Sequence, residues 1–248
     1  MIVLKSPDEI KRMAEACRIV AEVFDEIGRM IEPGITTKEI DRFVESFIIS
    51  KKAYPAFKGY RGYPASVCIS VNEEVVHGIP SSRRLKEGDI VSLDIGVYYK
   101  GFYGDGAVTF PIGEITESAE RLLRVTEDAL YKGIENAVIG KRVFDISYAI
   151  QSYVEGNGFS VVRNFVGHGI GRELHEEPQV PNFGKEGEGH PLMEGMTLAI
   201  EPMVNAGKSD VIILNDGWTA VTRDGSLSAH FEHTVAVTSN GPVILTKT

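Results

Sequence analysis

A turn-and-strand pattern occurs twice in the chain with the same internal spacing. The first copy, LKEGDIVSLD, runs from Leu85 to Asp94, and the second copy, LMEGMTLAIE, runs from Leu192 to Glu201. In each copy, a Glu-Gly turn leads into a strand-like segment that ends on an acidic residue. Matching units this far apart in the sequence predict two similar halves that pack about a pseudo-two-fold axis.

The segments around the repeat fit the same division. Capping boxes at Ser6 and Thr36 predict two helices near the N-terminus, and strand-like segments follow them. Two more helical patterns and a second set of strands complete the chain. The helices are expected over about residues 7–31, 37–50, 117–138 and 144–155, and the first strands over about 65–110. We therefore expect a single α+β domain over 1–248, with halves of about 1–112 and 113–248, one antiparallel sheet and helices on the outside.

The chain has more acidic than basic residues, with a net charge of −9 over 248 residues. This charge argues against DNA as a partner, because nucleic-acid binding favours a basic surface. The sequence has no signal-peptide pattern and no apolar run long enough to span a membrane, so we expect a cytoplasmic protein. Cys17 and Cys68 lie far apart in apolar settings and are interpreted as reduced thiols.

Four acidic residues lie on strand faces that otherwise carry small side chains. They are Asp94, Asp105, Glu201 and Glu232. The opposite faces are apolar, so alternation puts the acids on one side of the sheet and the core on the other. Four ionised carboxylates in one pocket would repel one another, and two divalent cations would balance their charge. A lone Asp beside a turn is more often a turn residue, but four acids at matched positions favour a two-metal hydrolytic site.

Three of the six histidines lie in loop-like settings beside Gly, Glu or Pro. His168 stands between two glycines in GHGIG, and the bare backbone on each side would let it approach a metal closely. His77 lies in VHGIP and His175 in LHEEP. Each one alone is more typical of a structural or surface histidine, but the three together indicate a site.

These residues carry a resemblance to a known family. Asp94, Asp105, His168, Glu201 and Glu232 match, in order and context, the five metal ligands of methionine aminopeptidases. The phrases around them resemble the type I branch of that family, including YRGYP, SVC, VHGIP, GHGIG and TLAIEP. The resemblance covers nearly the whole chain. It implies the pita-bread fold, in which two pseudo-symmetric α+β halves share a central antiparallel sheet.

The resemblance also implies an activity: removal of the N-terminal methionine from nascent proteins when the second residue is small. Two divalent ions, of Co, Mn or Fe, would activate a water molecule. Asp94 and Asp105 would chelate one ion, His168 and Glu201 would complete the other, and Asp105 and Glu232 would span both. Glu201 would also accept the proton of the attacking water.

Other residues are assigned to the substrate by the same resemblance. His77 and His175 would donate hydrogen bonds to the developing oxyanion and the scissile amide. The pocket for the methionine side chain would be lined by Tyr60, Tyr63, Cys68, His77, Leu174, His175 and Trp218. Each of these is also typical of core packing, and Leu174 stands where relatives commonly have a bulkier aromatic residue. Asn72 and Ser228 would lend backbone carbonyls to a monovalent cation.

The remaining expectations concern partners and alternatives. We expect a monomer, and ribosome docking is left open. Xaa-Pro peptidases share the five ligands but carry an added N-terminal domain, whereas the pattern here begins almost at residue 1. Type II enzymes insert a helical segment, for which the 31 residues from Glu201 to Glu232 leave no room. A non-enzymatic peptide-binding protein on this fold typically loses ligands, and all five are present here.

Overall fold

Three of the four α-helices in the described part of the chain begin after a serine or threonine whose side chain caps the first turn. The structure, a computed structural model, describes residues 2–247. The α-helices are α1 (Pro7–Met30), α2 (Thr37–Ser50), α3 (Glu117–Glu135) and α4 (Val143–Gly156). Ser6 and Thr36 each form the predicted capping box with the Glu three residues later. Within residues 2–247, no helix has the length and apolar character to cross a membrane.

A single antiparallel sheet forms the centre of the molecule. Its strand order is β1-β4-β5-β14-β9-β7-β8, with β2 added to β4 and β15 to β14. The strands of this sheet are β1 (Tyr54–Pro55), β2 (Cys68–Val71), β4 (Ile90–Tyr99), β5 (Phe102–Pro111), β7 (Val166–Gly169), β8 (Glu176–Pro181), β9 (Thr197–Ile200), β14 (Glu232–Thr238) and β15 (Gly241–Ile244). Strands from the first part of the chain meet strands from the second part where β5 pairs with β14.

Two small sheets and one 3₁₀ turn complete the fold. One sheet has the order β13-β10-β6 and the other β11-β12-β3. Their strands are β3 (Glu74–Val76), β6 (Ser160–Val161), β10 (Met203–Asn205), β11 (Val211–Ile213), β12 (Ala220–Thr222) and β13 (Ser228–His230), and the turn η1 covers Tyr60–Gly62.

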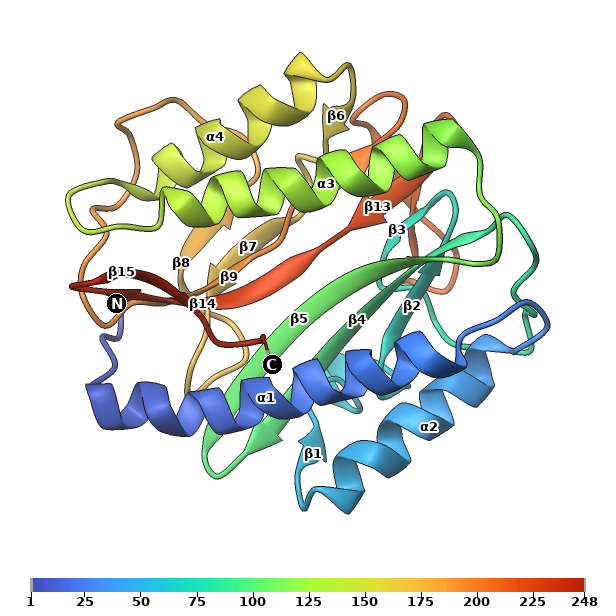
Figure 1. Cartoon of the computed structure of the whole chain (residues 1–248), viewed down its shortest axis with the longest axis horizontal. Helices are drawn as coiled ribbons and strands as arrows, with labels where there is room; N and C mark the ends of the chain where they lie inside the picture. The colour runs from blue at the N-terminus through green and yellow to red at the C-terminus, as the bar shows by residue number, and fades with distance from the viewer. Residues whose placement is uncertain (1, 248) are drawn as a thin grey trace.

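Each helix pair covers its own part of the central sheet. Figure 1 shows α1 and α2 on one side of the view, α3 and α4 on the other, and β5 and β14 running between them. Helix α1 packs on β4 and β5, whereas α3 contacts β9 and β14. The predicted α+β fold with two similar halves and one antiparallel sheet is confirmed. The division near residue 112 and the single-domain assignment stay predictions.

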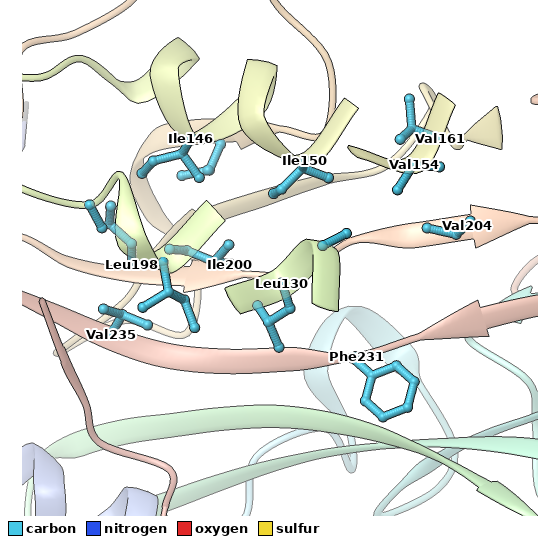
Figure 2. Close-up of a cluster of buried hydrophobic side chains, with 14 of the residues drawn as sticks. Leu130, Ile146, Ile150, Val154, Val161, Leu198, Ile200, Val204, Phe231 and Val235 are labelled. Atoms are coloured by element: carbon cyan, nitrogen blue, oxygen red, sulfur yellow. The ribbon is translucent and has the colours of Figure 1, made fainter. Parts of the chain in front are cut away.

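The apolar strand faces pack beneath these helices, as alternation predicts. Figure 2 shows Leu198 and Ile200 of β9 and Val235 of β14 in one buried cluster with Leu130 of α3 and Ile150 of α4. All five side chains are buried. Burying such side chains is the main favourable term in folding. The other face of the same strands is therefore free to carry polar side chains without breaking the core.

Candidate active site

Strand register places three of the predicted acids on one face of the sheet. Asp94 of β4 stands opposite Ala107 of β5, and Ala107 in turn stands opposite Glu232 of β14. Residues directly opposite one another in antiparallel strands point to the same face. Asp105 lies two residues from Ala107 and so shares that face. The small Ala107 leaves the space between Asp94 and Glu232 open.

The other two predicted ligands reach the same face from β7 and β9. Ala199 of β9 stands opposite both His168 of β7 and Thr234 of β14. Glu201 lies two residues beyond Ala199, one position past the end of β9. The sequence pattern placed it within the strand; the ladder stops because Pro202 follows, and proline has no backbone N–H to donate. The carboxylate of Glu201 still points toward His168.

Short distances show that four of these five side chains form one cluster, and Asp94 lines the same cavity. His168 Nε2 lies 3.6 Å from Glu201 Oε1 and 4.0 Å from Asp105 Oδ2. One possible ligand atom from each of Asp105, His168 and Glu232 falls within 4.8 Å of the others. His168 Nδ1 donates to the carbonyl of Gly169 at 2.9 Å. That bond keeps the proton on Nδ1, so the Nε2 lone pair faces the acids, as a metal-binding histidine requires.

Burial sets the protonation of the cluster when no cation is bound. Burial raises the pKa of Asp94 to about 7, and it raises the pKa values of Asp105, Glu201 and Glu232 well above the ordinary range, with the neighbouring acids adding to the effect. Burial also lowers the pKa of His168 to about 4, so its imidazole is neutral. An ionised acid in such a place is costly unless a positive charge compensates it.

The donor set of the cluster fits a divalent cation. Asp94 Oδ1 and Glu232 Oε1 are buried and find no hydrogen-bond partner within residues 2–247. Buried polar atoms are rarely left unpaired in native proteins, so an unpaired oxygen points to a ligand. Carboxylate oxygens with one neutral imidazole nitrogen form a ligand set that suits divalent metals. The buried cluster can therefore hold metal.

The cluster opens into a cavity that also contains every predicted pocket residue. The cavity has a volume of about 280 Å³, small beside the roughly 300–1,000 Å³ typical of drug-sized ligand sites. The predicted residues on its wall are Tyr60, Tyr63, Cys68, His77, Leu174, His175 and Trp218. The reactive groups and the apolar wall thus belong to one small site.

Aromatic edges and buried aliphatic groups form the apolar wall. The Trp218 ring meets the Tyr63 ring edge-on, with centroids 5.1 Å apart, and His77 meets Trp218 edge-on at 6.3 Å. Leu174 is buried, and Cys68 is a buried free thiol that stands opposite Asp94 in the β2–β4 pairing. The apolar wall therefore adjoins the carboxylates directly.

His175 lies at the exposed edge of the cavity and is held by Tyr60. The Tyr60 hydroxyl lies 2.8 Å from His175 Nδ1, and the two rings stack with centroids 5.3 Å apart. The His175 ring also lies 4.2 Å from that of His168, centroid to centroid. Desolvation lowers the pKa of His175, and His168 lowers it further. In the tautomer whose Nδ1 accepts the Tyr60 proton, the single proton of the neutral ring is on Nε2 and can be donated to a substrate.

Comparison with known proteins agrees with this geometry. The sequence model of metallopeptidase family M24 matches residues 11–239 of this chain. The chain belongs to metallopeptidase family M24.

Among M24 proteins, this chain is 57% identical to the methionine aminopeptidase of Clostridium perfringens over 246 residues, covering 99% of both chains. The crystal structure of methionine aminopeptidase from Thermotoga maritima superposes with a TM-score of 0.98 at 51% identity, covering all of both chains. The prolidase from Pyrococcus horikoshii, also similar, gives a TM-score of 0.82 at 26% identity, and the alignment covers 64% of it. The pita-bread fold and the resemblance to methionine aminopeptidases are both confirmed.

The M24 site also contains residues that the sequence analysis did not identify. They include Arg61, Asn164, Phe165 and Met203 on the cavity wall, and His230 beneath Glu201. His230 is 1% exposed, and its Nε2 lies 3.7 Å from Glu201 Oε2. His230 lies two residues before Glu232, and this spacing could have indicated that its side chain shares the face of the predicted metal ligand. Phe165 meets His77 edge-on at 5.3 Å, a contact that sequence spacing alone does not reveal.

The predicted monovalent-cation pair lies apart from this cavity. The backbone N–H of Ser228 donates to the carbonyl of Asn72 at 2.8 Å. The two residues are therefore neighbours, as a shared cation would need, but neither lines the cavity. Cation binding by their carbonyls stays a prediction.

We predict that Gly167→Ala will weaken both the fold and the metal site. A Cβ at Gly167 would lie 2.4 Å from the carbonyl oxygen of Ala199 and 3.1 Å from that of Val180. The added methyl must push β7 away from β9 and shift His168 relative to Glu201. Overpacking of this kind typically costs about 1–3 kcal/mol. Thermal unfolding and metal titration of the variant would measure the two effects.

Gly156→Ala is the matched control, because a Cβ there would meet nothing within 4 Å. It lies at the end of α4, where alanine suits the helix. Native-like stability and metal affinity in Gly167→Ala would contradict the close β7–β9 approach.

Proposed function

We propose that the chain acts as a methionine aminopeptidase, removing the N-terminal methionine from nascent proteins and peptides whose second residue is small. The observation that carries this proposal is the single cavity that joins the buried acid–histidine cluster to a small apolar pocket. Relatives that match this chain over nearly its full length are methionine aminopeptidases, and this similarity also supports the proposal.

Five residues would hold two divalent ions: Asp94, Asp105, His168, Glu201 and Glu232. Two ions would contribute a charge of +4 against the −4 of the four ionised carboxylates and so remove their mutual repulsion. The ions would also give the unpaired carboxylate oxygens a partner. Bound there, the ions would polarise the scissile carbonyl and lower the pKa of a water molecule. Mostly carboxylate ligands with one imidazole permit Co, Mn or Fe. Asn72 and Ser228 would hold a monovalent cation.

Glu201 would carry the proton through the reaction. Its carboxylate, beside His168 at 3.6 Å, would accept a proton from the attacking water and return it to the leaving amine. His77 and His175 would donate hydrogen bonds to the scissile amide and the developing oxyanion. The lowered pKa values of both rings keep them neutral, so each has one N–H to donate and a lone pair on the other nitrogen.

The apolar wall would select the methionine side chain. Cys68, Leu174 and Trp218 offer a thiol, an aliphatic group and an aromatic ring, and all three suit a polarizable thioether. Buried Leu174 gives the pocket less bulk at that position than an aromatic residue would. The preference for a small second substrate residue is proposed from the resemblance to methionine aminopeptidases.

The proposed substrates are made at the ribosome, so the proposed place of action is the cytoplasm, where docking on the ribosome would give access to nascent chains. The five proposed metal ligands and the seven proposed pocket residues all line this one cavity. A monomer therefore has a complete site, and we propose that the monomer is the active form.

Parallel assays on Met-Ala-Ser and Ala-Pro-Ser peptides would test the proposal. The metal-loaded protein should release methionine from the first peptide and leave the second intact. Norleucine-Ala-Ser replaces the sulfur with a methylene. Its kcat/KM should be lower than that of the methionine peptide by no more than about 10–200-fold, the range for a small apolar change in a pocket. Cleavage of only the proline peptide would favour an Xaa-Pro peptidase. Binding without metal-dependent turnover of any peptide would favour a non-enzymatic peptide-binding protein.

A further inference from the structure

The loop between β7 and β8 carries two residues of the active-site cavity. β7 ends at Gly169 and β8 begins at Glu176, and Leu174 and His175 lie between them. This segment forms no helix or strand of its own. Its conformation, and so the direction of the His175 ring, must be fixed by contacts from elsewhere.

Lys5 supplies such a contact from the N-terminal segment. It precedes α1, and its backbone N–H donates to the carbonyl of Gly195 at 2.7 Å. Its ammonium donates to the carbonyl of Val3 at 3.0 Å and forms an ion pair with Glu176 Oε2. The two side chains of the pair are 2% and 8% exposed. An ion pair this well buried differs from the solvent-exposed pairs that contribute little to stability.

The second oxygen of the same carboxylate holds the loop. Glu176 Oε1 accepts the backbone N–H of Arg172 at 2.8 Å and that of Glu173 at 3.2 Å. One carboxylate therefore connects the ammonium of Lys5 to the turn that leads into Leu174 and His175. Gly171 allows the approach, because a Cβ there would lie 2.2 Å from Lys5 Cε.

We propose that Lys5 and Glu176 are positioning residues for the reaction, which hold the 170–175 loop so that His175 and Leu174 face the substrate. The proposal rests on the aminopeptidase function above. Neither residue lines the cavity, so both act through their neighbours. Without Lys5, the buried carboxylate of Glu176 would lose its positive partner, and it would move toward water and take with it the backbone N–H groups that it holds.

The metal cluster should be insensitive to this change. Asp94, Asp105 and Glu232 lie on strands of the central sheet, and His168 is held by the pairing of β7 with β9. A displaced His175 would weaken hydrogen bonds that form as charge develops on the substrate. Misplacement of a reacting group by about 1 Å can cost 10²-fold in rate. We therefore expect Lys5→Met to lower kcat by roughly 10–100-fold, with metal affinity unchanged.

The test compares Lys5→Met, Glu176→Gln and the double variant on Met-Ala-Ser, with calorimetric metal titration of each protein. The double variant should be no worse than Lys5→Met, because residues that act as one unit are not additive. Lys5→Arg, which keeps the positive charge, should recover part of the rate. Arg172→Met is the matched control: it removes an exposed ion pair to Glu9 from the same loop, and should stay within about threefold of the wild type.

Hydrogen exchange provides a readout that does not depend on turnover. In Lys5→Met, the amides of Arg172 and Glu173 should exchange faster, while that of Ile170, bonded to Thr197, should not. An unchanged kcat in Lys5→Met would overturn the proposal. So would a fall in kcat that is accompanied by an equal loss of metal affinity, because that indicates general disruption. If the wild type itself cleaves no methionine peptide, the proposed function fails, and unchanged exchange at 172 and 173 would separately reject the loop-holding role.

Discussion

Glu201→Ala should lower kcat on Met-Ala-Ser by at least roughly 10²–10⁴-fold, the range for loss of a general base. The effect should be at the upper end, because one substitution removes both a proton acceptor and a metal ligand. Glu201 Oε1 lies 3.6 Å from His168 Nε2 and Glu201 Oε2 lies 3.7 Å from His230 Nε2, so this carboxylate is held between two imidazole rings. Single-turnover kinetics at saturating metal would measure the loss.

Two further variants make this result specific. Glu201→Gln keeps the shape and one oxygen ligand but cannot accept a proton, so it should retain more metal than Glu201→Ala and yet have a similarly low kcat. Glu194→Gln is the control, since Glu194 lies in the same repeat unit but is exposed. Turnover of Glu201→Ala near the wild-type rate would show that the proposed proton transfer is wrong.

The sequence predicted the acid face of the sheet because side-chain alternation is a local property. Asp94 shares a face with Ser92 in any straight strand, whatever its neighbours are. Which strands pair, and in which register, depends on the whole chain. The position of Cys68 opposite Asp94 therefore became visible only in the structure. Here the family resemblance, and not the periodicity, had placed Cys68 in the pocket.

At the end of α3, the apolar pattern of the sequence extends further along the chain than the helix does. The pattern predicts helix to about residue 138, but α3 ends at Glu135. Asn136 and Ala137 instead make i→i−3 bonds to Gly133 and Ile134, which tighten the last turn. Ala137 is still buried. The apolar pattern of the sequence indicates which side chains are buried. A side chain can be buried without an i→i−4 helical hydrogen bond at its backbone, so the pattern does not locate the end of the helix.

Lys5 could not be predicted as a buried residue. A lysine five residues from the N-terminus is typical of solvent-exposed chain, and lysine is almost never fully buried unless it is paired. Its partner, Glu176, lies 171 residues away. Only a fold that brings β8 beside the N-terminal segment creates the pair, so no local pattern in either segment indicates it.

Removing divalent metal with a chelator should abolish turnover, and two equivalents of Mn²⁺, Co²⁺ or Fe²⁺ should restore it. Within residues 2–247, His168 and His230 are the only basic side chains that lie within 4 Å of these carboxylates, and burial keeps both neutral, so neither balances the charge of the acids. Metal should also stabilise the fold, by about 2.7 kcal/mol at a free concentration of 100 times Kd. Activity and melting temperature measured across one titration would report both effects.

Asp105→Asn should reproduce the metal-free state even with metal in excess. Asp105 is 4% exposed and is one of the five residues that would hold the ions, so a neutral amide there would weaken metal binding. Asp8→Asn, which changes an exposed acid in the first turn of α1, should titrate like the wild type. Equal activity of the chelated and loaded proteins would contradict metal-dependent hydrolysis. Full recovery at one equivalent would instead contradict the second ion, and would mean that one of the five residues serves only to place the others.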